Sequence, residues 1–302
     1  MRDKITVVGS LNYDIILKIS RLPEKGETFP ANDIAFSSGG KGANQAVQAA
    51  KLGVDTYLIG CVGNDPNGQF LLDTVSSYGV NTDFVNKIEG SSGLGVVNAM
   101  DDGSVFAVIA RGANFQMTKK QIDDAVHLFK ESKIVILQME IDPKINEYVI
   151  DKAKEAGCIV LMNAAPAAPI DEEYMKKIDI LVVNEVEAAY YLGGEIDSRD
   201  KAEKGAKEFF DRYGNSCVIT LGSEGAVAGD KGNVAFIPAM KVPAVESTGA
   251  GDSFIGGMSY ALVQGMNLAD ACRFATKCSA VTVCRCGAQP SMPTFNEINQ
   301  GI

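Results

Sequence analysis

Thr248-Gly249-Ala250-Gly251-Asp252, followed at once by a run of residues typical of a helix, is the stretch that decides the fold. Its glycines let another molecule approach the bare backbone, and a helix that begins just after them directs unpaired N–H groups outward. The aligned peptide dipoles add partial positive charge there, so the stretch can bind a phosphate or a transferring phosphoryl group. Asp252 supplies a carboxylate beside this anion cradle, where it can accept a proton from an attacking hydroxyl. The alternative is a plain glycine turn in which Asp252 helps to cap the helix.

Composition restricts the class of protein. The chain has 302 residues, of which 46% are hydrophobic and 22% charged, as expected for one large globular domain. The formal net charge is -10 and no basic block occurs, so nucleic acid and anionic membrane surfaces are poor candidate partners. No apolar run approaches the roughly 20 residues of a membrane span, and the first residues lead straight into a short strand. We therefore expect a cytoplasmic protein.

The cysteines and the histidine give little indication of a metal, redox or acid–base site. The seven cysteines are odd in number and lack paired CxxC spacing, which predicts reduced, mostly buried thiols. Cys284 and Cys286 alone supply too few ligands for a metal site. His127 is the single histidine, and it lies in a segment predicted to be helical. We therefore assign acid–base chemistry to carboxylates.

Strands and helices alternate along most of the chain. A buried strand is predicted at 5–9, with further strands at 57–60, 134–137, 158–162, 178–183 and 217–221. Helices are predicted at 67–78, 119–129, 143–156, 199–213, 254–264 and 268–283. This alternation predicts a three-layer α/β/α domain with a mostly parallel central sheet, in which ligands bind at the carboxyl ends of the strands.

Two segments depart from this alternation. Residues 12–19 alternate in polarity, which places Asn12 and Asp14 on one face and Tyr13 on the other, and a turn leads to a second extended piece at 27–36. Residues 93–100 and 105–110 flank Asp101-Asp102-Gly103-Ser104, which is typical of a hairpin turn.

These four strands, at about 12–36 and 93–110, are expected to form a small four-stranded β lid over the site, inserted into a single domain that spans residues 1–302. A lone small sheet exposes one apolar face. The lid can therefore also pair with a second copy and form a homodimer.

A second glycine-rich loop, Gly39-Gly40-Lys41-Gly42-Ala43-Asn44-Gln45-Ala46, leads into an alanine-rich helix. It is neither a Walker A loop nor a dinucleotide fingerprint, because the required lysine–serine pair and third glycine are absent. Its glycines let a ligand approach, and Lys41 and Asn44 can bond the ligand's oxygens. The alternative is a simple connection into the helix.

Polar residues also follow three of the predicted strands. Glu140 is either a ligand contact or a charge near a helix N-terminus. Asn184 with Glu187 three residues later has the pattern of a capping box, and the functional alternative is a carboxylate that holds the water shell of Mg²⁺. The glycines and hydroxyls of residues 220–225 suit contact with nucleotide phosphates or ribose, or form a tight turn.

The order and spacing of these motifs resemble the ribokinase/PfkB-like carbohydrate kinase family over essentially the whole chain. The 248–252 signature is common to carbohydrate and nucleoside kinases of this family. The loop at 39–46 and Gly287-Ala288-Gln289-Pro290-Ser291 are similar to its ribose-specific branch.

The resemblance implies an ATP-dependent sugar kinase that phosphorylates the 5-hydroxyl of D-ribose to give D-ribose 5-phosphate. Asp252 would be the catalytic base, and Gly249, Ala250 and Gly251 would bind the transferring phosphoryl group. The sugar-binding residues that it implies are Asn12, Asp14, Gly40, Lys41, Asn44 and Glu140, together with Asp252. The ATP-binding residues that it implies are Asn184, Glu187, Thr220, Gly222, Ser223, Gly225, Gly251 and Thr276.

Two metal ions are implied as well. Glu187 would hold Mg²⁺ through water. A monovalent cation, K⁺, would bind at Glu246, Thr248, Thr282, Arg285, Gly287 and Ser291. The family usually carries aspartate where this chain has Glu246, and the extra methylene moves the carboxylate by roughly 1.5 Å, which affects cation choice or affinity.

Several alternatives remain open. The substrate can be 2-deoxyribose, another small sugar or a nucleoside, and a nucleoside kinase would need an aromatic platform such as Phe29, Phe36 or Phe106. A non-catalytic sugar-binding sensor on the same fold is more remote, because it would not need Asp252.

Overall fold

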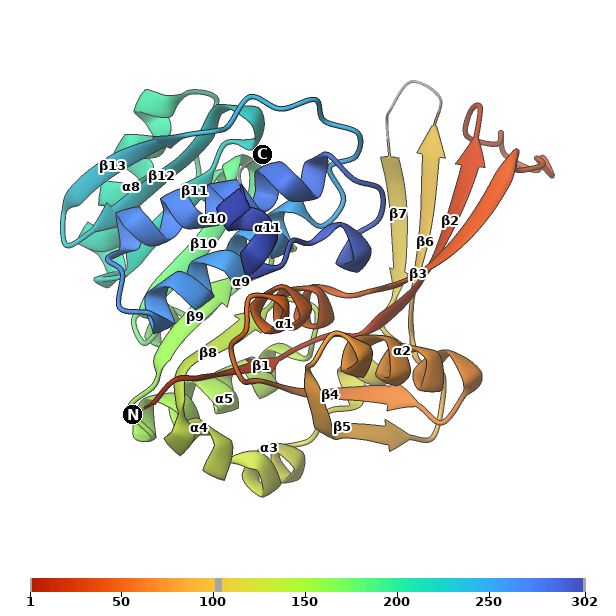
Figure 1. The fold of residues 1–302 in the computed structure, drawn as a ribbon, viewed down its shortest axis with the longest axis horizontal. Coiled ribbons are helices and arrows are strands. Elements are labelled where there is room, and N and C mark those ends of the chain that lie inside the picture. Colours follow the sequence, from red (N-terminus) through yellow and green to blue (C-terminus); the bar gives the residue numbers. More distant parts are fainter. Residues whose placement is uncertain (1, 101–104, 301–302) are drawn as a thin grey trace.

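Two sheets organise the chain. The computed structural model describes residues 2–100 and 105–300. A nine-stranded sheet lies between two layers of helices, and a four-stranded sheet stands apart from this body (Figure 1). The predicted fold class, a mostly parallel three-layer α/β/α domain with a small additional sheet, is confirmed.

The central sheet is parallel except at one end. Its strands follow the order β13 (Asn233–Pro238), β12 (Gly225–Asp230), β11 (Ser216–Thr220), β10 (Ile180–Asn184), β9 (Ile159–Asn163), β8 (Ser132–Gln138), β1 (Lys4–Val8), β4 (Thr56–Gly63) and β5 (Asn81–Ile88). The pairs β11–β12 and β12–β13 are antiparallel, and the other pairs of this sheet are parallel. The sequence analysis missed three strands: β5, in which polar residues interrupt the apolar ones, β12, which consists mainly of small residues, and β13, which is short and ends in proline.

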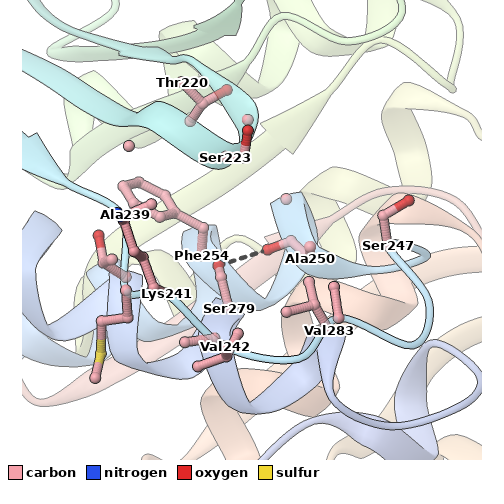
Figure 2. A pocket seen from close by; sticks show the side chains of 17 residues that line it. Thr220, Ser223, Ala239, Lys241, Val242, Ser247, Ala250, Phe254, Ser279 and Val283 are labelled. Atoms are coloured by element: carbon pink, nitrogen blue, oxygen red, sulfur yellow. Dashed lines mark hydrogen bonds between the residues drawn. The ribbon is translucent and has the colours of Figure 1, made fainter.

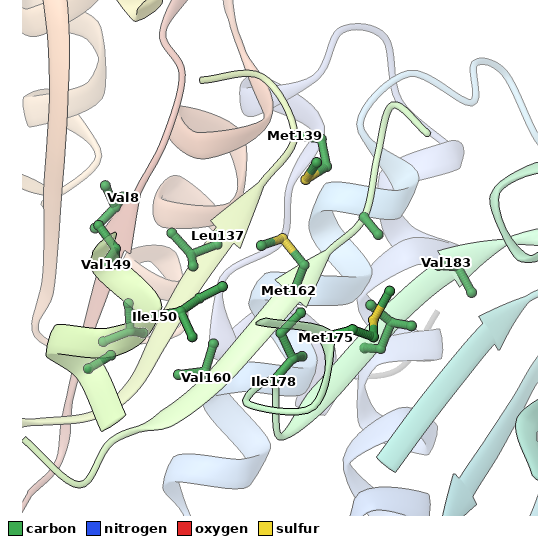
Figure 3. Close-up of a cluster of buried hydrophobic side chains, with 14 of the residues drawn as sticks. Val8, Leu137, Met139, Val149, Ile150, Val160, Met162, Met175, Ile178 and Val183 are labelled. Atoms are coloured by element: carbon green, nitrogen blue, oxygen red, sulfur yellow. The ribbon is translucent and has the colours of Figure 1, made fainter. Parts of the chain in front are cut away.

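Alternation along the strands explains the two helical layers. Val7 packs in a cluster with α1 (Lys41–Lys51), α2 (Pro66–Ser77), α9 (Ala250–Val263) and α10 (Leu268–Val283). Val8 points to the opposite face and packs in a cluster with α3 (Lys119–Ala125), α4 (His127–Glu131), α5 (Pro143–Glu155), α7 (Glu185–Leu192) and α8 (Arg199–Tyr213). Figure 3 shows the part of this second cluster around α5. The short helices α6 (Glu172–Met175) and α11 (Phe295–Gln300) complete the set of described α-helices.

Two helices differ from the predicted ranges. The single helix expected at 119–129 is divided at Val126, where the backbone tightens into bonds between residues three apart. The helix expected at 254–264 begins earlier, at Ala250. Gly251 and Asp252 consequently lie inside its first turn.

The second sheet has the strand order β3 (Asp33–Gly39), β2 (Asn12–Ile19), β6 (Gly93–Met100) and β7 (Val105–Ala110). The pair β2–β6 is parallel and the two outer pairs are antiparallel. The strand expected at 27–36 lies instead at 33–39, so the start of the glycine-rich loop belongs to the sheet. The predicted turn at 101–104 lies outside the described residues.

Within residues 2–100 and 105–300, no helix has the length and apolar composition that crossing a membrane requires.

Candidate active site

The site forms where neighbouring parallel strands end. The strands β11, β10, β9 and β8 end at Thr220, Asn184, Asn163 and Gln138, and β1 continues into the segment 9–12. Because adjacent parallel strands end at the same edge of a sheet, these polar residues gather there although they lie far apart in the sequence.

The anion cradle forms the start of α9. Gly249 has a φ of 77°, in the left-handed region that glycine tolerates best, and it is the N-cap of the helix. Ala250 bonds back to Ser247, whereas the N–H groups of Gly251 and Asp252 have no hydrogen-bond partner among the described residues. Unpaired amides at the positive end of a 14-residue helix can bind an anion.

Asp252 is almost fully buried beside this cradle. It is 8% exposed, and its carboxylate accepts hydrogen bonds from Asn44 Nδ2 and Gln45 Nε2, both at 2.9 Å. Burial raises the pKa of Asp252 overall, although the positive charge of Lys41 and the two amide donors act in the opposite direction. A carboxylate with a raised pKa is a better proton acceptor than an ordinary aspartate.

Asp14 lies on β2 of the second sheet, between two glycines. A Cβ atom at Gly39 or at Gly95 would overlap its carboxylate, so only glycine leaves room for it. Burial, with the nearby negative charges of Glu140 and Asp252, raises the pKa of Asp14 to about 7.

Lys41 provides the opposite charge at the start of α1. Burial lowers the pKa of its ammonium group, but the attraction of Asp252, Glu140 and Glu187 outweighs this effect and raises the pKa overall. The site therefore combines one cation with several carboxylates.

Glu140 holds the glycine-rich loop in place. Its Oε2 accepts hydrogen bonds from Ser10 Oγ at 2.6 Å and from the backbone N–H of Lys41 at 3.1 Å. Gly40, with a φ of 89°, precedes α1 at this point. Glu140 thus fixes the backbone that carries Lys41 and leaves a second carboxylate oxygen for other contacts.

Asn12 has a buried partner that sequence reasoning missed. Asn114 Nδ2 donates to Asn12 Oδ1 at 2.8 Å, and Asn114 also bonds both backbone groups of Leu11. Asn114 therefore fixes the orientation of the Asn12 amide. An isolated asparagine about 100 residues away gives no recognisable sequence pattern.

A cavity of about 610 Å³ opens beside the cradle, and Ala250 and Gly251 line it whereas Asp252 does not. Six of the eight residues expected to bind ATP line it: Thr220, Gly222, Ser223, Gly225, Gly251 and Thr276. Figure 2 shows Thr220 and Ser223 on one side of the cavity and Val242, Ser279 and Val283 on the other. Mostly apolar walls with a few hydroxyl groups suit a nucleotide base.

The sequence analysis did not predict the residues that form one wall of this cavity. The loop after β13 contributes Ala239, Met240, Lys241, Val242 and Ala244, and it has no motif that marks it. Phe254 and Ser279 also line the cavity, and Ser279 Oγ donates to the backbone oxygen of Ala250 at 2.8 Å.

Asn184 and Glu187 are not among the residues that line the cavity. They form a complete capping box at the start of α7: Asn184 Oδ1 accepts from Glu187 N at 2.8 Å, and Glu187 Oε2 accepts from Asn184 N at 2.9 Å. Glu187 Oε1 has no hydrogen-bond partner among the described residues. The capping role therefore leaves one oxygen that can bind a metal-bound water.

The residues expected at a monovalent cation site lie together near the cradle. Glu246 Oε2 accepts from the Gly287 N–H at 2.9 Å, so the longer side chain reaches the neighbouring segment. Arg285 pairs with Glu297 and also donates to the Ser291 carbonyl. The hydroxyls of Thr282 and Ser291 donate to carbonyls of their own segments. Thr248 follows Glu246 on the approach to the cradle.

No three His, Cys, Asp or Glu side chains cluster as metal ligands in residues 2–100 and 105–300. Mg²⁺ or K⁺ would therefore be held by carbonyls, waters and phosphates together with single carboxylates, which is the coordination that Mg²⁺ prefers beside a nucleotide. All seven cysteines are free, and five of them are buried.

A phosphoryl group bound at the start of α9 would lie between a cavity of nucleotide size and a buried carboxylate, which is the layout of a kinase for a small hydroxyl-bearing molecule. The chain belongs to the pfkB family of carbohydrate kinases, whose family model matches residues 2–295.

Its relatives include kinases named for two sugars. It is 36% identical to the ribokinase of Schizosaccharomyces pombe, over 98% of this chain and 96% of that one. It is 33% identical to the deoxyribokinase of Salmonella typhi, over 98% and 97%. The structure of Arabidopsis thaliana ribokinase complexed with ribose and ATP superposes with a TM-score of 0.91, at 31% identity and coverage of 99% and 98%.

Proposed function

We propose that this chain is an ATP-dependent ribokinase, which transfers the terminal phosphoryl group of ATP to the 5-hydroxyl of D-ribose and gives D-ribose 5-phosphate. The observation that carries this proposal is the buried Asp252 carboxylate beside the unpaired amides of α9, with the cavity on their far side. The ribokinases among the relatives, one of them solved with ribose and ATP, support ribose as the acceptor.

Asp252 acts as the base in this mechanism. It accepts the proton of the 5-hydroxyl as that oxygen attacks the phosphorus, and the bond to ADP breaks. Gly249, Ala250 and Gly251 present backbone to the transferring phosphoryl group and stabilise its negative charge. Positioning of the two substrates and charge stabilisation supply most of the rate acceleration.

The sugar lies between the second sheet and the edge of the central sheet. Its hydroxyls bond to Asn12, Asp14, Gly40, Lys41, Asn44 and Glu140. The second sheet acts as a lid that excludes water and protects ATP from hydrolysis. This sheet is an insertion at about 12–36 and 93–110 into a single domain that comprises residues 1–302.

Two metal ions support the reaction. Glu187 would hold Mg²⁺ through water, and the ion would neutralise phosphate charge of ATP. Glu246, Thr248, Thr282, Arg285, Gly287 and Ser291 would hold a monovalent cation, K⁺, several of them through backbone carbonyls, and this ion would strengthen the positive potential of the cradle.

The protein acts as a cytoplasmic homodimer that assembles through the lid. Ile34, Phe36, Phe106 and Val108 are each about half exposed or more, and the strand register places them on one face of the second sheet. A second copy would cover this apolar face.

The second candidate substrate is 2-deoxy-D-ribose, which the similarity to a deoxyribokinase favours. A nucleoside is less suited to this site. Phe36 packs against Tyr13, with ring centroids 5.8 Å apart, on the face of the sheet away from Asp14, and Phe29 lies under Arg21. The strand register places Phe106 on the same face as Phe36, so neither of these two rings forms a platform on the Asp14 side of the sheet.

The test is ADP release from MgATP with D-ribose, 2-deoxy-D-ribose, D-fructose or adenosine as acceptor, each in K⁺ and in Na⁺ buffer. We expect preference for ribose and higher activity in K⁺. Preference for another acceptor would reassign the substrate and keep the mechanism. Binding of sugar without ADP release from any acceptor would indicate a sensor.

A further inference from the structure

Two chains of buried amides converge on the Asp252 carboxylate. Gln289 Nε2 donates to Asn44 Oδ1 at 3.0 Å, and Asn44 Nδ2 donates to Asp252 Oδ2. On the other oxygen, Gln138 Nε2 donates to Gln45 Oε1 at 2.9 Å, and Gln45 Nε2 donates to Asp252 Oδ1. Both carboxylate oxygens therefore receive an N–H from a side chain that a further amide holds in place.

The direction of both chains is set by Asp252. An ionised carboxylate only accepts hydrogen bonds, so Asn44 and Gln45 must turn their NH₂ groups toward it and their oxygens away. Each next glutamine must then donate, and Gln138 Oε1 and Gln289 Oε1 are left buried without a hydrogen-bond partner in the described part of the chain. These amides keep the orientation that serves Asp252, although it leaves two buried oxygens without hydrogen bonds.

Gln45 is fixed more completely than Asn44. It is fully buried, and its NH₂ group also donates to Asn163 Oδ1 at 3.1 Å, at the end of β9. Both hydrogens of Gln45 Nε2 are thus used inside the protein, whereas Asn44 keeps one free hydrogen for a ligand. Gln45 consequently has no hydrogen left for the sugar.

We propose that Gln45 is a positioning residue for the sugar kinase reaction: held by Gln138 and Asn163, it fixes one oxygen of Asp252 so that the carboxylate faces the attacking hydroxyl. This inference rests on the proposed kinase function. Gln45 thereby has a role separate from that of Asn44, which is the residue proposed to contact the sugar.

A donor to the carboxylate also favours its charged form. The other charged groups that act on Asp252 are Lys41 on α1, which attracts its negative charge, and Glu140 after β8, which repels it; Asp14 on β2 lies near both carboxylates. Loss of the Gln45 donor while these groups stay in place should raise the pKa of Asp252. The acid limb of the pH profile of kcat should then move to higher pH.

The experiment compares Gln45→Met with Gln48→Met. Gln48 lies one turn further along α1, is equally buried, and bonds to Ser253 and the Pro293 carbonyl instead of Asp252. We expect both variants to lose thermal stability to a similar extent. Only Gln45→Met should shift the acid limb of kcat upward, by about one pH unit, and lower kcat about tenfold or more at pH 7, with KM for ribose changed less than about threefold.

A second variant covers the case in which Gln45→Met does not fold. Gln45→Glu keeps the shape but places a second carboxyl group beside Asp252, so the pair should share a proton and the acid limb should again move upward. An acid limb unchanged from the wild type in the folded variants, or a raised KM with unchanged kcat, would overturn the positioning role. Absence of ADP release by the wild-type protein would instead refute the proposed function.

Discussion

At the scale of single residues, the site depends on how each carboxyl group is surrounded. Asp252 and Asp14 have similar chemistry and both are partly or fully enclosed, yet Asp252 is bonded by two amides while Asp14 lies between two glycines. The first environment fixes the orientation of the proposed base. The second leaves the Asp14 carboxylate without such fixed donors, as its proposed role in sugar binding requires.

Replacement of Asp252, the proposed base, should stop the reaction. Asp252→Asn is expected to lower kcat by at least about 10³-fold, because the amide cannot accept the proton, while ATP still binds. Steady-state kinetics and calorimetric titration of ATP measure the two effects. Asp270→Asn, an exposed aspartate in the first turn of α10, is the control and should retain activity. Near-normal turnover of Asp252→Asn would remove Asp252 as the base.

The raised pKa of Asp14 predicts a pH dependence of stability. Between about pH 4 and 7 the folded protein keeps a proton that the unfolded chain has lost, so this group makes the folded state less stable as pH rises. Asp14→Asn removes this effect and should raise Tm by about 2 °C or more at pH 8, with little change at pH 4. Thermal melts at both pH values measure it, and the exposed Asp33→Asn serves as the control.

The same group should govern sugar binding with the opposite sign. Only ionised Asp14 accepts two hydroxyl bonds, so KM for the sugar should fall as pH rises through about 7. Asp14→Asn should raise KM by roughly 10–100-fold at pH 8, which is the loss of a bond to a charged group. A KM that does not respond to pH or to this substitution would place Asp14 outside the sugar site.

At the scale of elements, two helix N-termini meet the site through glycines that serve different purposes. A Cβ atom on Gly42 would lie 2.5 Å from Ser10 N and 2.6 Å from the Gly9 carbonyl carbon, so α1 packs directly on the end of β1. A Cβ atom on Gly251 would meet no atom within 4 Å. The first glycine allows packing, and the second leaves space at the cradle.

Substitution of these two glycines by alanine should therefore have opposite effects on stability and activity. Gly42→Ala should destabilise the fold by about 1–3 kcal/mol, because the backbone must shift to admit the methyl group. Gly251→Ala should leave Tm unchanged or slightly higher, because alanine is the better helix former, yet lower kcat/KM for ATP at least about tenfold by crowding the phosphoryl group. Melting curves and kinetics of both variants, with Gly194→Ala as a neutral control, measure the difference. Full activity of Gly251→Ala would place the phosphoryl group elsewhere.

At the scale of the whole molecule, the second sheet has an apolar face on which Ile34, Phe36, Phe106 and Val108 remain about half exposed or more. We expect a dimer in solution, and Val108→Asp should make it a monomer because Val108 is 68% exposed on that face. Sedimentation equilibrium measures the change. Val186→Asp provides the matched control, since Val186 is 74% exposed on α7, a helix that packs against α8, β10 and β11 of the central body. A wild-type monomer, or dissociation by both substitutions, would contradict assembly through the lid.

The sequence by itself determined the local structure and the family. Hydrophobic periodicity predicted most strands of the central sheet, because short-range patterns specify local backbone geometry. The glycine motifs predicted helices next to them, but α1 begins at Lys41, within its motif, and α9 begins at Ala250, before the predicted residue 254. The capping box at Asn184 and Glu187 was also visible, since it needs residues only three apart. The strands β5, β12 and β13 were not predicted. Polar residues interrupt β5, β12 consists mainly of small residues, and β13 is a short strand that ends in proline.

Only the tertiary structure decided which side chains meet. Gln45 and Asp252 are 207 residues apart, and Asn12 and Asn114 are 102 apart, so no spacing in the sequence relates them. Strand order and the packing of α1 against α9 bring them together. The glycines that make room for Asp14 come from β3 and β6, on either side of β2. Local sequence preferences determine each element, whereas sheet topology and close packing determine which elements are neighbours. The orientation of the Asp252 carboxylate depends on those neighbours.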